Sequence, residues 1–332
     1  MDRYRYIILL IIVIIYIIVN YLMKTTKVSK KYTNKLNNLI DTKLNNSDNK
    51  LFLCPFIELG DNIIINGAIR YLSNIYKTIV YVCKKSNYNQ ISYMYSDLNN
   101  IIYYIIPDKY SVSYINYYIP VDNIVLEKFN KYNIKYINII NSSTDDLTKY
   151  MYIYINNDIV KKLYLNLKLS IDIGYKYFKV PRDEKRENLL YNKLVNIIGD
   201  KYIVIIDDEK RNFLINETYL NDINLPVYKL SKNSKNKDNR LNDVTSEYIF
   251  DYIKILENAD SIYSIDTSIL WLIDFLNINT KTYAYCARND ICEYRNKNIR
   301  KLSLYTKDVI TSNINSNNYV IKVPKDYILP FL

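Results

Sequence analysis

The stretch LFLCPFIELGDNIIINGAIRYL, residues 51–72, decides the fold class. Its first seven residues form an apolar run typical of a buried strand, and the apolar residues of 62–76 then recur at helical spacing. The same alternation continues outward along the chain. Further strands are predicted at 78–83, 101–106 and 135–140, and further helices at 88–98 and 121–132. Because strands that alternate with helices form parallel sheets, the sequence predicts an α/β lobe with helices on both faces.

A second alternation of the same kind follows residue 200. Strands are predicted at 202–206, 227–230, 261–265 and 281–286, and helices at 246–258 and 267–277. Between the two alternations, Pro181 and the charged stretch 182–187 indicate a break. We therefore predict two Rossmann-like lobes, residues 51–180 and residues 181–332. Folds of this kind bind ligands at the carboxyl ends of their strands, in the cleft between lobes.

The N-terminus predicts a membrane anchor. Residues 6–22 read YIILLIIVIIYIIVNYL, an apolar run that is just long enough to span a bilayer core. A cleaved signal peptide is disfavoured, because it requires small residues at the cleavage site and the first alanine is Ala68. Residues 1–23 are therefore predicted to be a single-pass anchor, and the polar residues 24–50 a stem.

The charges around the anchor leave its orientation open. Arg3 and Arg5 precede the span and a lysine cluster follows it, which slightly favours a cytosolic body. Three N-x-S/T sequons, at Asn45, Asn141 and Asn216, would instead be usable in a lumen. The sequence leaves open whether the membrane is that of a host or of a virus, and on which side of it the body lies.

The amino-acid composition excludes several classes of enzyme. The chain has 38 Tyr, 4 Gly and no His, a bias that follows from A/T-rich codons and is typical of large DNA viruses or parasites. Without histidine, Ser-His-Asp hydrolases, Cys-His proteases and HExxH metalloenzymes are excluded. The four cysteines are widely spaced and form no CxxC pair, so no metal site is predicted. Any general base must therefore be Asp, Glu, Lys or Tyr.

The formal net charge of +11 does not by itself indicate a nucleic-acid partner. Much of the excess lies in lysines beside the predicted anchor, and no Arg-rich run or aromatic-basic motif is present. Attraction to anionic lipid or to phosphate ligands explains such a surface better. We expect a membrane and small phosphate ligands as partners, and no nucleic acid.

Two glycines, Gly60 and Gly67, flank the first candidate site. Gly60 is predicted to permit a tight turn, and Gly67 to let the following helix pack closely on the sheet. Between them, Asp61 lies at or near the start of that helix. Its carboxylate is suited to act as a general base toward a hydroxyl group, or simply to cap the helix, and both interpretations stay open.

A diphosphate can be held where the first strand of the second lobe ends. This strand runs into Asp207 and Asp208, and Lys210 and Arg211 follow immediately. Basic side chains at a strand end bind phosphate oxygens, arginine through two parallel hydrogen bonds. The same residues are also compatible with a charged surface turn.

A second anion site is predicted at the start of a late helix. Asp266, Thr267 and Ser268 follow a strand and open an amphipathic helix. Two hydroxyls and the unpaired N–H groups of a helix start suit an anion. The same three residues also form an ordinary capping sequence.

Together these segments resemble the heptosyltransferase-type glycosyltransferases of the GT-B superfamily, and related uncharacterised viral and bacterial transferases. Gly60-Asp61-Asn62, with the later Gly67 and Arg70, resembles the front loop of that family. Residues 259–276 resemble its late A-D-x-φ-φ-S-x-D-[ST]-S segment. The expected fold is therefore GT-B-like, with the acceptor bound by the first lobe and the nucleotide-sugar by the second.

The resemblance implies an inverting transfer of a sugar from a nucleotide-diphosphate donor, without a cofactor or an essential metal. Asp61 would deprotonate the acceptor hydroxyl, which belongs to a glycan, a lipid or a protein. The other implied residues would cradle the donor diphosphate or neutralise the leaving group: Asp266, Thr267, Ser268, Lys210 and Arg211.

Two departures from the family pattern keep other hypotheses open. The family often has a glycine after the late Asp-Ser/Thr pair and a histidine one turn later, whereas this chain has Ser268-Ile269 and Trp271-Leu272. A degenerate, non-catalytic, membrane-anchored α/β protein that binds a partner or glycan is the main alternative. A nucleotide-binding oxidoreductase is the third hypothesis, and it is weakened because G-x-G-x-x-G is absent.

Overall fold

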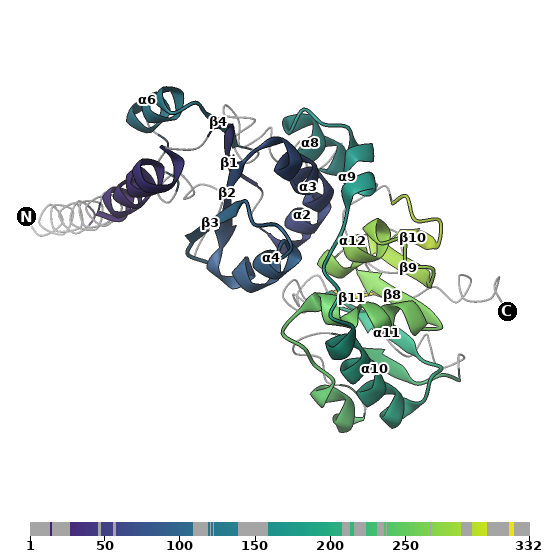
Figure 1. The fold of residues 1–332 in the computed structure, drawn as a ribbon. Coiled ribbons are helices and arrows are strands. Elements are labelled where there is room, and N and C mark those ends of the chain that lie inside the picture. The colour runs from purple at the N-terminus through teal and green to yellow at the C-terminus, as the bar shows by residue number, and fades with distance from the viewer. Residues whose placement is uncertain are drawn as a thin grey trace, which may run out of the picture. The chain divides into compact units, whose positions relative to one another are not determined.

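The computed structural model of the chain divides into two compact units (Figure 1). It describes residues 14, 27–45, 48–55, 58–108, 119, 121, 123–138, 159–207, 213–215, 224–230, 236, 238–265, 267–286, 294–303 and 319–321. Unit 1 comprises residues 1–55, 73–88 and 100–140, and unit 2 comprises residues 56–72, 89–99 and 141–332. Each unit is built on a parallel sheet, which confirms the predicted α/β class.

Unit 1 holds a four-stranded parallel sheet in the order β3-β2-β1-β4. Its strands are β1 (Lys50–Cys54), β2 (Thr78–Lys84), β3 (Ile101–Ile106) and β4 (Ile134–Asn138). Lys50 pairs with both Thr78 and Ile134, so three strands begin at the same edge of the sheet. All five residues of β1 are buried, as expected for a central parallel strand covered on both faces.

The core of unit 1 is aromatic. The Phe52 ring of β1 lies 5.3 Å from the Phe129 ring of α6 (Asn123–Lys131), and 6.1 Å from the rings of Tyr104 and Tyr136. Aromatic rings attract one another at centroid distances of about 4.5–7 Å. These contacts fix α6 on the sheet.

The segment predicted as a polar stem is helical over much of its length. Residues 27–39 form a helix that continues into a π-helical turn, η1 (Ile40–Leu44), and residues 27–44 are called the stem helix below. Leu36, Ile40 and Leu44 recur every four residues and are fully buried. Such a narrow apolar stripe suffices to dock one face of a helix, although the segment as a whole is polar.

Two contacts join the stem helix to α6. The buried ammonium of Lys50 donates to the Leu44 carbonyl and, over 2.7 Å, to the Tyr132 carbonyl, so it binds the end of each helix. About one turn before these ends, Lys128 pairs with Asp41 at 2.8 Å. Because the two contacts lie at matching distances from the helix ends, the stem helix and α6 run side by side and parallel.

The predicted anchor, residues 6–22, lies outside the described residues except for Ile14. Within the part of the chain that the structure describes, none of the helices is long and apolar enough to cross a membrane. The single-pass anchor therefore stays a prediction.

Unit 2 holds a five-stranded parallel sheet in the order β10-β9-β8-β5-β7. Its strands are β5 (Ile203–Ile206), β7 (Val227–Lys229), β8 (Ser261–Ile265), β9 (Lys281–Cys286) and β10 (Ile299–Ser303). A separate parallel pair joins β6 (Phe213–Ile215) to β11 (Tyr319–Ile321). The sequence predicts β5, β7, β8 and β9 but misses β6, β10 and β11, of which β10 carries two basic residues.

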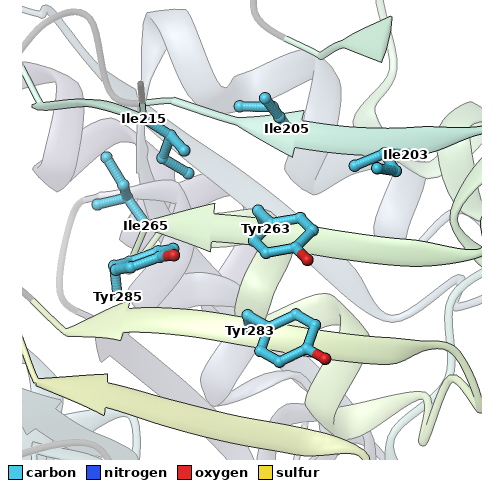
Figure 2. Packing of buried hydrophobic residues seen from close by; sticks show 7 residues of the cluster. All are labelled: Ile203, Ile205, Ile215, Tyr263, Ile265, Tyr283 and Tyr285. Atoms are coloured by element: carbon cyan, nitrogen blue, oxygen red, sulfur yellow. The ribbon is translucent and has the colours of Figure 1, made fainter. Parts of the chain in front are cut away.

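Isoleucine and tyrosine side chains line one face of the unit 2 sheet (Figure 2). They come from alternate positions of neighbouring strands, as the two-residue period of a strand requires: Ile203, Ile205, Tyr263, Ile265, Tyr283 and Tyr285, with Ile215 beside them. The Tyr263 and Tyr283 rings stack at 4.7 Å. Burial raises the pKa of Tyr263 to about 12, so this tyrosine stays protonated and is unsuited to act as a base.

The helices of unit 2 include pieces from the first half of the chain. They are α2 (Leu59–Ile64), most of α3 (Asn66–Ile75) and α4 (Tyr88–Met94), α8 (Ile159–Asn166), α9 (Ile171–Tyr177), α10 (Glu184–Ile198), α11 (Ile253–Asn258) and α12 (Ser268–Phe275). The expected boundary near residue 180 therefore differs from the observed division. The single helix predicted at 62–76 is in fact two helices, α2 and α3, which separate at Ile65. The helix predicted at 246–258 begins as the 3-10 turn η7 (Ile249–Tyr252), and only its last six residues form α11.

Candidate functional site

The first turn of α2 carries the predicted general base. Glu58 is the N-cap residue, and Leu59, Gly60 and Asp61 are the first helical residues. Asp61 is therefore the third residue of the helix rather than its cap, and it is half-buried. The Asn62 side-chain amide donates to the Glu58 carbonyl over 2.6 Å and closes the turn. A carboxylate in this place is stabilised by the positive end of the helix dipole.

Gly60 brings this turn against the first turn of α12. A Cβ atom at Gly60 would lie 3.6 Å from the Ser268 Cα atom, and 3.8 Å from both the Ser268 nitrogen and the Trp271 ring. The tight turn predicted for Gly60 is wrong, because Gly60 is helical and, among the four glycines, all of them described, only Gly199 has a positive φ. Gly60 instead lies where the two helix starts touch within unit 2.

The start of α12 carries an unused hydroxyl. Thr267 is the N-cap residue, with φ −130° and ψ 173°, but its side chain does not cap the helix. Its Oγ1 atom is buried and forms no hydrogen bond within the described residues. A buried unpaired polar group costs about 1–3 kcal/mol, a cost that a ligand accepting its proton would remove. The neighbouring Asp266 lies outside the described residues.

The basic residues predicted to bind the diphosphate, Lys210 and Arg211, lie outside the described residues, between β5 and β6. Asp207, at the end of β5, is buried. Its carboxylate accepts the Ile215 N–H over 2.7 Å and lies 4.0 Å from the Lys229 ammonium. Asp207 thus fastens β6 beside the sheet and lies next to the Lys229 ammonium of β7.

Gly67 has the packing role predicted for it, but toward a different partner. A Cβ atom at Gly67 would lie 1.9 Å from the Gly174 carbonyl oxygen of α9, so α3 approaches a helix and not the sheet. A Cβ atom at Gly174 would in turn lie 2.1 Å from the Tyr164 hydroxyl. That hydroxyl donates to the Ile64 carbonyl over 2.9 Å. The predicted contact with the sheet is therefore wrong. Gly67 and Gly174 are needed because α3 and α9 approach each other there too closely for a side chain.

Arg70, the last residue of the motif that resembles the family's front loop, is a structural clamp. Its guanidinium donates to the carbonyls of Lys179 and Met94, each over 2.7 Å, and to both oxygens of Asp97 at 2.9 and 3.1 Å. Partial burial opposes ionisation of Asp97, but hydrogen bonds from Arg70 and Lys179 outweigh it and lower the pKa of Asp97 to about 2. Arg70 therefore ties α3 to α4 and to residue 179.

A buried carboxylate on α12 was not anticipated. Asp274 is 1% exposed and accepts hydrogen bonds from the Tyr175 hydroxyl and from the backbone N–H groups of Arg295 and Asn296, at 2.5, 2.9 and 2.8 Å. Burial raises the pKa of Asp274. The Tyr175 ring also stacks on Phe275 at 4.4 Å. These contacts hold α12 in place, and the signal for them was a single acid in the apolar run SILWLIDF.

The described part of the chain contains no set of side chains that could hold a metal ion. There, no group of three or more His, Cys, Asp or Glu side chains is placed to hold a metal ion. Cys54 and Cys83 are free and buried, and burial raises the pKa of the Cys83 thiol to about 12. This thiol is therefore neither a nucleophile nor a metal ligand at neutral pH.

No family model and no curated protein matches the sequence. Among solved structures, the chain is similar to a glycosyl transferase of family 9 from Veillonella parvula, with a TM-score of 0.45, 9% identity, and 78% of this chain and 88% of that chain covered.

Two proteins of E. coli are also similar. ADP-heptose lipopolysaccharide heptosyltransferase II has a TM-score of 0.42 and 9% identity, with 76% of this chain and 90% of that chain covered. Heptosyltransferase WaaC with ADP-2-deoxy-2-fluoro heptose has a TM-score of 0.38 and 9% identity, with 76% and 92% covered.

Proposed function

We propose that the chain is a glycosyltransferase that moves a sugar from a nucleotide-diphosphate donor to an acceptor hydroxyl, with inversion and without an essential metal. The observation that carries the proposal is the contact between α2 and α12. Gly60 lies against Ser268, so the carboxylate of Asp61 and the start of α12 belong to one region of unit 2 although about 200 residues separate them. A base and an anion-binding helix start are the two parts that such a transfer requires.

Each part has a role in the proposed reaction. Asp61 takes the proton of the acceptor hydroxyl as that oxygen attacks the sugar. The Thr267 hydroxyl and the N–H groups that open α12 bind the donor diphosphate. Lys210 and Arg211 offset the charge that develops on the leaving nucleotide diphosphate. Asp266 belongs to the same donor-binding segment.

The proposed setting is a membrane. Residues 6–22 would hold the enzyme beside a membrane-bound glycan, lipid or protein acceptor, as a single-pass anchor. The lysines that follow this run favour an anionic lipid surface over a nucleic acid as the partner of the basic charge.

Binding of the donor is tested by thermal unfolding of the full chain with a panel of nucleotide-diphosphate sugars. A donor present at 100 times its Kd stabilises the folded state by about 2.7 kcal/mol. We expect Thr267→Val, which removes the hydroxyl and keeps the shape, and Arg211→Ala to reduce this stabilisation.

A matched control is available on β9. The Thr282 hydroxyl donates to the Thr280 carbonyl over 3.0 Å, so Thr282→Val should lower the melting temperature and keep the donor-induced shift. Donor-induced shifts that are unchanged in both Thr267→Val and Arg211→Ala would refute the proposed donor site.

Trp271 gives the alternative of a degenerate binding protein its specific support. Trp271 is 5% exposed, packs against Tyr294 at 5.0 Å and touches the Gly60 position. It stands in the helical turn where the related family often has a histidine. Donor binding by the wild type without any sugar transfer to a panel of acceptors would favour this alternative.

A further inference from the structure

The strand order of unit 2 marks one place on its sheet as suited to a ligand. β7 lies on one side of β5, whereas β8, β9 and β10 lie on the other, so the direction of the chain across the sheet reverses between β5 and β8. In open parallel sheets, ligands bind at the carboxyl ends of the strands where this reversal occurs. Asp207 directly follows β5, and Thr267 lies two residues after β8. The proposed donor-binding start of α12 therefore lies beside this reversal.

Lys229 is a basic residue at the same edge of the sheet. It is the last residue of β7. The described strands of this sheet end in Ile206, Lys229, Ile265, Cys286 and Ser303, and Lys229 is the only basic residue among these five. A basic side chain at the carboxyl edge is placed to attract an anionic ligand that binds there.

The side chain of Lys229 reaches from β7 to the end of β5. In the register of these two parallel strands, Lys229 is opposite Ile205, and Asp207 is two residues nearer the carboxyl edge on the same face. The Lys229 ammonium lies 4.0 Å from the Asp207 carboxylate. The ammonium is therefore drawn toward the carboxyl edge and toward β5, one of the two strands at the reversal.

Hydrogen bonds fix the backbone on both sides of Lys229. The buried Asn236 side chain accepts the Lys229 N–H over 2.7 Å and donates to the Lys229 carbonyl over 3.4 Å. On the other side, the Leu230 N–H donates to the Ile205 carbonyl over 2.8 Å. Because the strand end is held in this way, little backbone freedom is lost when the ammonium binds an anion.

Asp207 makes a neighbouring positive charge necessary for an anion to bind. The Asp207 side chain is 2% exposed and that of Lys229 is 20% exposed. A buried carboxylate repels a diphosphate strongly, because water screens its charge poorly. The pair distance of 4.0 Å is longer than the roughly 2.7–2.9 Å of a charge-assisted hydrogen bond. Lys229 thus offsets the charge of Asp207 without donating a hydrogen bond to it.

We propose that Lys229 is a further donor-binding residue, whose ammonium contacts the diphosphate of the nucleotide-sugar. Asp207 is the positioning residue that draws this ammonium from β7 to the end of β5. Neighbouring strands are about 4.8 Å apart, so the end of β5 lies one strand from the segment that opens α12. The inference rests on the proposed function and adds a described basic group to Lys210 and Arg211.

Isothermal titration calorimetry of the full chain with ADP, UDP, GDP and CDP tests the proposal, and the tightest binder of the four serves as the probe. Lys229→Gln removes the charge and keeps a long polar side chain. We expect it to weaken probe binding by about 10- to 100-fold, the range for a lost hydrogen bond to a charged group. The affinity for the corresponding nucleoside, which lacks the phosphates, should stay unchanged. Lys229→Arg keeps the charge and should retain most of the probe affinity.

Two further variants separate charge from structure. Lys281→Gln makes the same change of charge at the exposed first residue of β9, at the opposite edge of the sheet, and should leave probe binding unchanged. Asp207→Asn in the Lys229→Gln background removes the uncompensated carboxylate and keeps an oxygen that can accept the Ile215 N–H. This double variant should bind the probe more tightly than Lys229→Gln alone.

Several results would overturn the proposal. Wild-type probe affinity in Lys229→Gln would do so, and an equal loss of probe and nucleoside affinity would assign Lys229 a structural role instead. If Thr267→Val weakens probe binding and Lys229→Gln does not, the proposed donor site stands and only the assignment of Lys229 fails. If none of the four nucleoside diphosphates binds the wild type, the proposed function fails together with it.

Discussion

At the scale of single residues, two glycines in neighbouring helices set different limits on their surroundings. A Cβ atom at Gly67 would lie 1.9 Å from the Gly174 carbonyl oxygen, a distance that forces backbone to move. We expect Gly67→Ala to lower the free energy of unfolding by at least about 1–3 kcal/mol, the usual cost of overpacking. Denaturant unfolding followed by circular dichroism measures this loss.

Gly60 is the matched control. A Cβ atom there would lie 3.6 Å from the nearest atom, which is ordinary contact, and alanine favours a helix over glycine by about 1 kcal/mol. Gly60→Ala should therefore leave the free energy of unfolding unchanged or raise it. A Gly67→Ala protein as stable as Gly60→Ala would contradict the close crossing of α3 and α9.

The ion pairs of Asp97 predict how stability depends on pH. Hydrogen bonds from Arg70 and Lys179 lower the pKa of Asp97 from 3.8 to about 2 in the folded state. A lowered pKa stabilises the folded state above the unfolded value, and this contribution is lost as pH falls from about 4 toward 2. Unfolding titrations across this range should show a weaker pH dependence in Asp97→Asn than in the wild type. The exposed Asp243→Asn should keep the wild-type slope, and identical slopes in all three proteins would refute the ion-pair argument.

At the scale of elements, the stem helix carries the sharpest difference between expectation and structure. Ile40 is fully buried although it lies in a polar segment. Removing such a side chain typically costs about 2–5 kcal/mol, so Ile40→Ala should destabilise unit 1 by that order. Lys43→Ala, at an exposed position of the same helix, should cost far less. A polar tether would predict no effect from either change, as read by denaturant unfolding of the full chain.

The strands could largely be predicted from the sequence, and several helices could not. Strands β1, β2, β3 and β5 are compact, largely apolar runs, and such runs have few alternatives in a parallel sheet. The stem helix was missed because its three buried apolar residues, Leu36, Ile40 and Leu44, do not stand out among lysines and asparagines. The break between α2 and α3 at Ile65 leaves no mark in the apolar spacing of residues 62–76.

The sequence predicted the residues at the two helix starts of the candidate site, but not the contacts that hold these helices together. The sequence placed Asp61 at a helix start and Thr267 at another, and both positions are found there. The predicted tight turn at Gly60 was wrong, because Gly60 is helical and lies in ordinary contact distance of Ser268, about 200 residues away. Asp274 was overlooked, because only the fold brings Tyr175 and the backbone at residues 295–296 to it.

At the scale of the whole molecule, the chain does not divide where its sequence changes character. Residues 56–72 and 89–99 belong to unit 2, because Gly67 and Arg70 pack against residues 174 and 179. The charged stretch at 182–187 is also no simple break, since Arg182 pairs with Glu257 at 2.9 Å and Asp183 caps α10. One consequence matters for function: α2 and α12 lie in the same unit, so the proposed base and the proposed donor-binding helix start are built on one framework.

The most direct test of this arrangement is sugar transfer by the full-length chain in membranes, compared between the wild type, Asp61→Asn and Glu58→Gln. Glu58 is the exposed N-cap residue of the same helix and controls for a change of local charge. We predict that Asp61→Asn lowers turnover by about 10²–10⁴-fold, the usual contribution of a general base, while donor-induced stabilisation is retained and Glu58→Gln stays close to the wild type. Turnover by Asp61→Asn at the wild-type rate would contradict the assignment of Asp61 as the base.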